Sequence, residues 1–126
     1  RMKMNLNEWR DEVHKTAVEH GWWDKEVSFP EIVALCHSEL SEALEEYRNG
    51  RPVAYADDYS DEGFGRITDL SKFEGRKPEG TAMEMADCLV RILDWCGEEN
   101  IDIEQMVKIK SKYNKTRPYR HGGKVI

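Results

Sequence analysis

The sequence predicts an all-α protein, a bundle of four to five helices, and three observations support this fold class. Apolar residues recur at helical spacing in four separate segments of the chain. Residue pairs typical of helix N-termini stand at the start of each segment. The one long stretch without a sustained period lies between the second and third segments, which indicates a loop insert within a helical fold.

The first two predicted helices cover residues 6–20 and 28–49. Each starts with the spacing of a capping box, in which a polar side chain and a Glu three residues later satisfy free backbone amides. These pairs are Asn5 with Glu8 and Ser28 with Glu31. Gly21 and Gly50 follow the two segments and predict where the helices stop.

The third helix is predicted over residues 81–97 and the fourth over residues 102–114. Capping-box spacing recurs at both starts, in Thr81 with Glu84 and in Asp102 with Gln105. The third segment is apolar around most of its circumference, so we expect a central, buried helix. Its single polar stripe consists of Glu84, Asp87, Arg91 and Asp94.

Residues 51–80 form the predicted insert, for which we expect a short strand pair or a helical turn. Inserts of this length are often functional. The chain length of 126 residues predicts a single domain over residues 1–126, with a basic C-terminal tail over residues 115–126.

Composition excludes some classes of function. The formal charge of −6 argues against a protein that binds nucleic-acid polymers or anionic membranes. No apolar run reaches membrane-spanning length, and the odd number of cysteines, three, predicts buried free thiols. We therefore expect a cytoplasmic protein. A charged fraction of 35% suits a core that is shared between subunits.

Two carboxylate pairs carry the predicted chemistry. Glu39 lies inside the apolar arc of the second helix with Glu42 at its edge, and Glu84 and Asp87 share the polar stripe of the third helix. The i, i+3 spacing puts each pair on one helix face. If the two faces meet, four carboxylates converge, and a divalent cation relieves their repulsion. Ligands that are all oxygen favour Mg²⁺, or Mn²⁺, and suit phosphoryl chemistry.

The same spacing also fits an ordinary charged surface. In that interpretation the two pairs are solvated helix faces, and Arg91 forms an ion pair with Asp87 or Asp94. Glu46 and Asp94 are then solvated as well, whereas in the metal-site interpretation they can assist the site.

At these residues the chain resembles the MazG-like, all-α nucleoside triphosphate pyrophosphohydrolases, most of all their short stand-alone branch in phages and bacteria. The resemblance covers nearly the whole chain outside residues 51–76, although the stretch between the carboxylate pairs is longer here than in compact members. It rests on the following segments: Glu39-Leu40-Ser41-Glu42, Glu84-Met85-Ala86-Asp87, Gly21-Trp22-Trp23-Asp24, Lys77-Pro78-Glu79-Gly80, and the tail from Asn114 to Gly123.

The resemblance implies Mg²⁺-dependent hydrolysis of a (deoxy)nucleoside triphosphate between its α and β phosphates, which gives a monophosphate and pyrophosphate. It implies that four catalytic carboxylates are the Mg²⁺ ligands, and that the protein is a homodimer or homotetramer. These carboxylates are Glu39, Glu42, Glu84 and Asp87.

Further substrate contacts follow from the resemblance. Trp23 is expected to contact the base or sugar, with Trp22 as the more deeply buried neighbour, although Trp23 also suits a core position. Lys112, Asn114 and Arg117 are expected to bind phosphate. The alternative for these three is a solvated basic helix end.

A second class of function stays open from the sequence. An acidic helical bundle could be a non-catalytic module that binds a protein partner or senses a nucleotide without cleaving it. Its carboxylates would then be solvated or salt-bridged, and Mg²⁺ would change its stability little.

Overall fold

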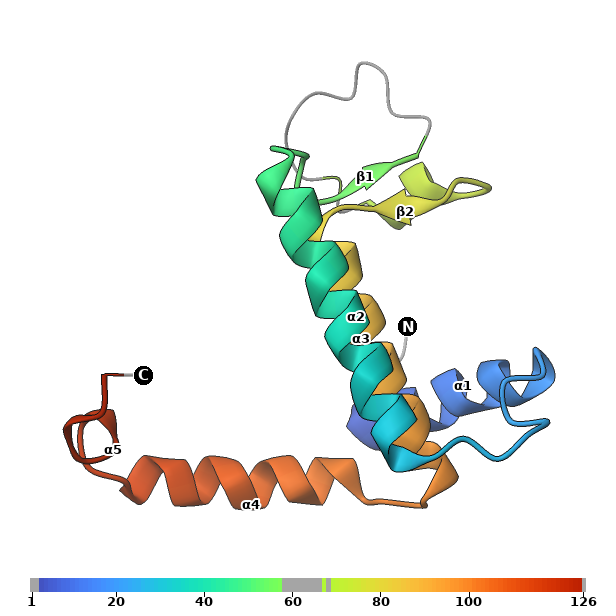
Figure 1. The fold of residues 1–126 in the computed structure, drawn as a ribbon. Coiled ribbons are helices and arrows are strands. Elements are labelled where there is room, and N and C mark those ends of the chain that lie inside the picture. Colours follow the sequence, from blue (N-terminus) through green and yellow to red (C-terminus); the bar gives the residue numbers. More distant parts are fainter. Residues whose placement is uncertain (1–2, 58–66, 68, 126) are drawn as a thin grey trace. The chain divides into compact units, whose positions relative to one another are not determined.

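The computed structural model describes residues 3–57, 67 and 69–125, and it confirms the all-α prediction. The long helices are α1 (Leu6–Glu19), α2 (Phe29–Arg48), α3 (Thr81–Glu98) and α4 (Ile103–Thr116) (Figure 1). The short elements are the strands β1 (Tyr55–Ala56) and β2 (Pro78–Glu79), the 3₁₀ helix η1 (Leu70–Phe73) and α5 (Arg120–Gly123). The predicted ends of the long helices agree with these bounds to within about two residues, as the capping signals allow.

The chain forms two compact units. The central unit is Gly21–Ile92, and the terminal unit combines Arg1–His20 with Leu93–Ile126. The prediction of one domain stays a prediction. Within the predicted insert and tail, residues 58–66, 68 and 126 lie outside the described residues.

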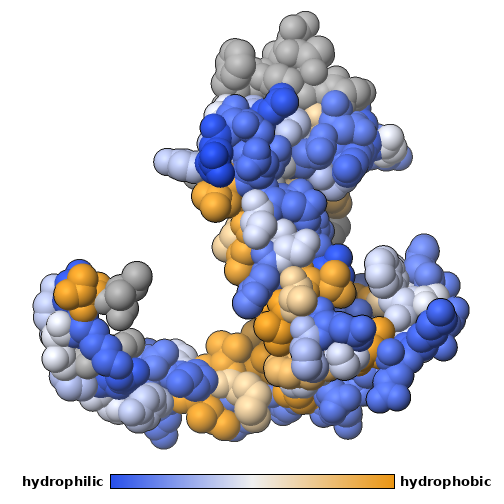
Figure 2. Space-filling model, viewed as in Figure 1, coloured by the Kyte–Doolittle hydropathy of each residue, from blue (hydrophilic) through white to orange (hydrophobic). Residues whose placement is uncertain are grey.

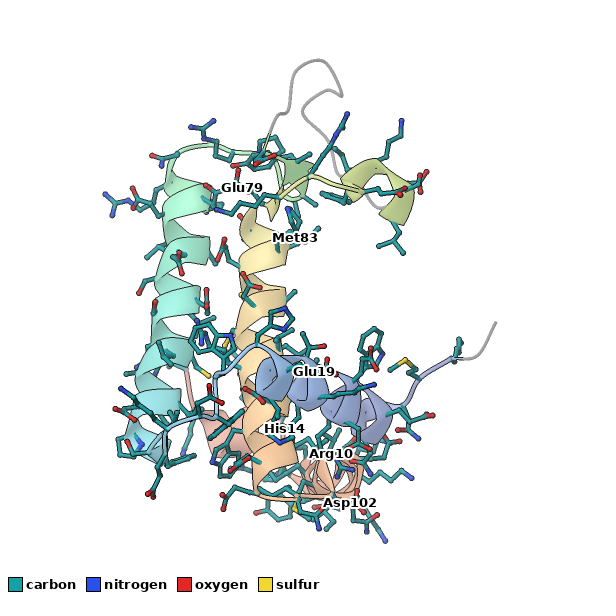
Figure 3. The ribbon with its side chains drawn as sticks, turned by 90° about the vertical axis from the view of Figure 1, so that its right-hand side faces the viewer. Arg10, His14, Glu19, Glu79, Met83 and Asp102 are labelled. Atoms are coloured by element: carbon teal, nitrogen blue, oxygen red, sulfur yellow. The ribbon has the colours of Figure 1, made fainter. Side chains whose placement is uncertain are left out.

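In the central unit α2 and α3 lie side by side and run in opposite directions (Figures 1 and 3). The predicted capping box fixes the start of α2: Ser28 accepts a hydrogen bond from the amide of Glu31 at 3.3 Å, and Glu31 accepts one from the amide of Ser28 at 2.8 Å. The helix ends at Arg48, and Gly50 then takes a positive φ of 66°. This pair of helices positions every predicted carboxylate ligand.

The described part of the insert contains both the strand pair and the helical turn that the sequence allowed. β1 pairs with β2 in antiparallel register, with Tyr55 opposite Glu79. Tyr55 is buried, and its hydroxyl donates a hydrogen bond of 2.6 Å to Glu46. The insert is therefore anchored on α2 one turn or more beyond the carboxylate pair.

Gly80 lets the end of the insert pass close to the backbone of Val53 just before α3 begins. Its φ is +113°, and a Cβ atom there would overlap the carbonyl group of Val53. That same carbonyl accepts a hydrogen bond of 2.9 Å from the amide of Ala82. Helix α3 begins at Thr81 itself, so its first turn is held by this contact, and Glu84 follows one turn later.

In the terminal unit polar contacts join the first half of α1 to the start of α4 and to the turn before it. The amide of Leu6 donates to Glu104 at 3.1 Å, and Arg10 donates to the carbonyl of Ile101 at 2.8 Å. Figure 3 shows Arg10 and His14 on α1, beside the last part of α3. There His14 lies 2.8 Å from Asp94, and its Cβ atom would be only 2.5 Å from a Cβ placed on Gly97. Gly97 therefore permits the close approach of α1.

The expectation that α3 is a central, buried helix is wrong for the described residues. Cys88, Leu93 and Cys96 are buried, but Met85 and Leu89 are 51% and 49% exposed. Within the central unit α2 is the long helix beside α3, and a single neighbour can cover only one side of a helix. Apolar periodicity indicates which faces can be buried, but it does not supply the partner that buries them.

Apolar side chains also reach the surface of α4 near its start (Figure 2). Met106 and Val107 are 44% and 48% exposed, and they line a shallow hollow of about 570 Å³ along that helix. None of the described helices is long and apolar enough to cross a membrane.

Candidate functional site

The four predicted carboxylates come from the facing helices of the central unit. Glu39 and Glu42 are one turn apart on α2, and Glu84 and Asp87 are one turn apart on α3. The two helices run antiparallel and side by side (Figure 3), and the charges of both pairs act on one another across them. The structure shows the predicted convergence for Glu39, Glu42 and Glu84.

Three of the carboxylates form a close cluster. One carboxylate oxygen from each of Glu39, Glu42 and Glu84 lies within 4.8 Å of the other two. Glu39 is buried, Glu84 is half-buried and Glu42 is exposed, so the cluster runs from the helix interface to solvent. Asp87 lies outside this group of three, but its charge acts on both Glu42 and Glu84.

Glu39 has an ion-pair partner that the sequence did not predict. The Nε atom of Arg91 donates a hydrogen bond of 2.7 Å to Oε2 of Glu39. The glutamate side chain is 8% exposed and the arginine side chain 28% exposed. The solvated-surface interpretation paired Arg91 with Asp87 or Asp94, and the observed partner is neither of these. A buried carboxylate needs such a partner, because burial without one costs several kcal/mol.

The pKa values of three carboxyl groups of the site are raised by burial, by hydrogen bonding and by the charges of their neighbours. Burial raises the pKa of Glu84 to about 7, and the charges of Glu42, Asp87 and Glu39 push it in the same direction. The hydrogen bond with Glu39 raises the pKa of Glu42, and loss of hydration raises that of Asp87.

Glu39 behaves differently from its neighbours. Burial alone would raise the pKa of Glu39, but the hydrogen bond from Arg91, helped by those with Glu42 and Glu84, holds it below the ordinary value. At neutral pH Glu39 is therefore ionised, whereas Glu84, with a pKa of about 7, is only partly protonated. The negative charge is concentrated and only partly balanced by Arg91.

This donor set fits a hard divalent cation. All donors are carboxylate oxygens, which is the ligand type that Mg²⁺ and Mn²⁺ prefer. Oxygens that share one Mg²⁺ lie about 2.1 Å from it, so they are at most about 4.2 Å apart. The observed spread of up to 4.8 Å among the three oxygens is slightly wider. Neighbouring oxygens of an octahedral Mg²⁺ are only about 3 Å apart, so the three side chains must draw closer together to share one cation.

Comparison of the chain with protein-family models, with curated proteins and with solved structures found no match in any of the three. The interpretation of the site therefore rests on its own geometry and charge.

The two neighbouring tryptophans are placed differently from the expectation. Trp22, expected as the buried member, is 61% exposed, whereas Trp23 is half-buried. The guanidinium group of Arg91 lies 6.0 Å from the centre of the Trp22 ring. Arg91 therefore contacts both Trp22 and Glu39, and the indole of Trp22 remains mostly exposed. The expected contact of Trp23 with a base or sugar stays a prediction.

The predicted phosphate ligands belong to the terminal unit. Lys112 and Asn114 are exposed on α4, and Arg117 follows the end of this helix. The guanidinium group of Arg117 lies 5.7 Å from the ring of Tyr113. The carboxylates belong to the central unit, so the two sets of residues lie in different units. The role of Lys112, Asn114 and Arg117 stays a prediction.

Glu46 and Asp94, which the metal-site interpretation allowed as assisting groups, have structural partners. Glu46 accepts the hydrogen bond from Tyr55, and burial together with this bond raises the pKa of Tyr55 to about 12. Asp94 lies against His14. Sequence reasoning missed Tyr55 and the bond between Arg91 and Glu39, although it does place Arg91 on the polar stripe with Glu84 and Asp87.

Proposed function

We propose that the protein is a Mg²⁺-dependent nucleotide pyrophosphohydrolase of the MazG-like, all-α kind. The observation that carries this proposal is the convergence of carboxylates from α2 and α3, with the pKa of Glu84 raised to about 7. Strongly perturbed carboxylates that face one another are a mark of functional sites, and an all-oxygen donor set indicates a hard cation. The resemblance of the sequence supplies the reaction class.

The reaction is attack of water on a (deoxy)nucleoside triphosphate between the α and β phosphates, which releases a monophosphate and pyrophosphate. Glu39, Glu42, Glu84 and Asp87 would hold the Mg²⁺, which would neutralise phosphate charge and acidify a water. Burial of Glu39 between two helices fixes the direction of its carboxylate. Lys112, Asn114 and Arg117 are the proposed phosphate contacts, and Trp23 the proposed base or sugar contact.

The proposal includes a homodimer or homotetramer in the cytoplasm. Exposed apolar side chains on both helices of the central unit support self-association, since a second copy could cover them. They are Leu40, Leu44 and Tyr47 on α2 and Met85 and Leu89 on α3. The free thiols of Cys36, Cys88 and Cys96 support a reducing compartment. A mass measurement by light scattering that gives a monomer at micromolar concentrations would contradict the oligomer.

A panel of canonical and modified (d)NTPs with Mg²⁺, with separate detection of pyrophosphate and orthophosphate, tests the function. We expect pyrophosphate and a monophosphate from at least one nucleotide, and no release when EDTA removes the cation. Orthophosphate as the product would indicate a different phosphohydrolase. The absence of any product with Mg²⁺ and with Mn²⁺ would refute the proposal.

A thermal melt with and without Mg²⁺ separates this proposal from a non-catalytic acidic module. A cation that binds the folded cluster raises Tm with concentration, because binding stabilises only the folded state. Solvated carboxylates would give little change beyond that caused by an equal ionic strength of NaCl.

A further inference from the structure

Arg91 connects two features of the central unit that differ in exposure. Its Nε atom bonds to the buried Glu39 at 2.7 Å, and its guanidinium group lies 6.0 Å from the ring of the exposed Trp22. The positive charge of Arg91 thus lies next to both the buried carboxylate of Glu39 and the exposed ring of Trp22. The side chain is partly exposed itself, at 28%, so solutes can reach it.

The guanidinium group has unused hydrogen-bonding capacity. It carries five N–H donors in a fixed fork, and within the described part of the chain only Nε donates to a side chain, that of Glu39. The other donors are on the terminal nitrogens, which are the pair that binds phosphate oxygens in a bidentate manner. Arg91 can therefore serve an anion other than Glu39 without moving far.

Glu39 cannot remain buried and ionised without a counter-charge, so either a cation or a proton must neutralise it. Arg91 fills this role in the structure. A divalent cation held by Glu39, Glu42 and Glu84 would fill the same role and would be repelled by a guanidinium so close to it. The charge of Arg91 also acts on Asp87 and Glu42, and a phosphate group bound at the same cation would be a further anion for its terminal nitrogens.

We propose that Arg91 exchanges partners during binding: it neutralises Glu39 before the cation arrives, and it binds a phosphate group of the substrate afterwards. This inference rests on the proposed function. Arg91 is thereby a substrate-binding residue and a competitor of the cation for Glu39. A purely structural link between α2 and α3 would also explain the ion pair, but it makes different predictions for affinity.

The first test is a calorimetric titration of Mg²⁺ into the protein without nucleotide. Arg91→Gln removes the positive charge that repels the cation, so we expect Mg²⁺ to bind about tenfold more tightly than in the wild type. Arg91→Lys keeps the charge and should bind Mg²⁺ as the wild type does. Arg48→Gln, at the exposed end of α2, is the matched control for loss of one positive charge. Equal or weaker Mg²⁺ binding by Arg91→Gln overturns the exchange.

The second test is binding of inorganic pyrophosphate in the presence of saturating Mg²⁺. We expect binding about tenfold or more weaker in Arg91→Gln, with partial recovery in Arg91→Lys, which lacks the fork. Unchanged pyrophosphate binding in Arg91→Gln overturns the inference. If Arg91→Gln does not fold, Arg91→Lys carries the test: wild-type Mg²⁺ affinity with weaker pyrophosphate binding supports the exchange, and equal affinity for both ligands overturns it.

The outcomes for the wild type separate this inference from the proposed function. A wild type that releases pyrophosphate from a nucleotide, with variants that bind Mg²⁺ and pyrophosphate unchanged, overturns the inference alone. A wild type that neither binds Mg²⁺ nor cleaves any nucleotide overturns both.

Discussion

Replacing Glu39 by Gln is expected to remove nearly all Mg²⁺-dependent pyrophosphate release. Glutamine keeps the volume of the side chain and can still accept the hydrogen bond from Arg91, but it brings no charge to the cluster. Loss of a cation ligand that supplies about 4 kcal/mol of charge stabilisation corresponds to a fall of about a thousandfold in kcat/KM. Initial rates of pyrophosphate release at saturating Mg²⁺ measure this effect. Asp87→Asn should act in the same direction.

The matched control for Glu39→Gln is Glu45→Gln, the same change on an exposed position of α2. This control should keep wild-type activity, since Glu45 does not belong to the cluster. Melting curves of the wild type and of all three variants show whether a loss of activity is only a loss of folding. Full activity in both Glu39→Gln and Asp87→Asn would contradict the assignment of the cluster as the catalytic centre.

The position of Glu39 could be predicted because it breaks a pattern. A charged residue inside an apolar helical arc is costly in a core, so its presence there predicts either a partner or a ligand. The helix starts could be predicted for a similarly local reason. Ser28 and Glu31 satisfy each other's backbone amides within one turn, so no tertiary information is needed to recognise them.

The partner of Arg91 and the exposure of Trp22 could not be predicted, because both depend on tertiary structure. The spacing on α3 puts Arg91 one turn from Asp87, yet its long side chain reaches across to Glu39 on the other helix. Trp22 and Trp23 are adjacent in a loop, where no period tells which indole faces inward. Lys112 and Asn114 share this difficulty, since helical spacing does not relate one compact unit to the other.

Without a divalent cation the wild type should lose stability as the pH rises. The pKa of Glu84 is about 7 in the folded protein, against an ordinary value of 4.5. The folded state therefore holds this proton more tightly than the unfolded state does. The stabilisation that this gives is complete below pH 4.5 and is lost as the pH rises through 7. Glu42 and Asp87, whose pKa values are also raised, act in the same direction.

Glu84→Gln cannot titrate, and in EDTA at pH 7.5 it should be more stable than the wild type. The rise in pKa from 4.5 to about 7, at about 1.4 kcal/mol for each pH unit, sets a ceiling of about 3.5 kcal/mol. We expect a gain in Tm of roughly 5–10 °C at pH 7.5 and nearly equal Tm values at pH 5. Glu45→Gln should follow the wild type at both pH values. If Tm depended on pH in the same way in Glu84→Gln and in the wild type, Glu84 would be neither buried nor repelled by the other carboxylates.

Addition of Mg²⁺ should reverse the order of the two proteins. The wild type gains stability because the cation removes the repulsion among Glu39, Glu42 and Glu84. Glu84→Gln has already lost part of that repulsion together with a ligand, so it should gain much less. Glu84 would then lower the stability of the protein in EDTA and raise it with Mg²⁺. Such a cost in stability is expected of a residue that serves ligand binding. A solvated carboxylate on a helix surface would show neither effect.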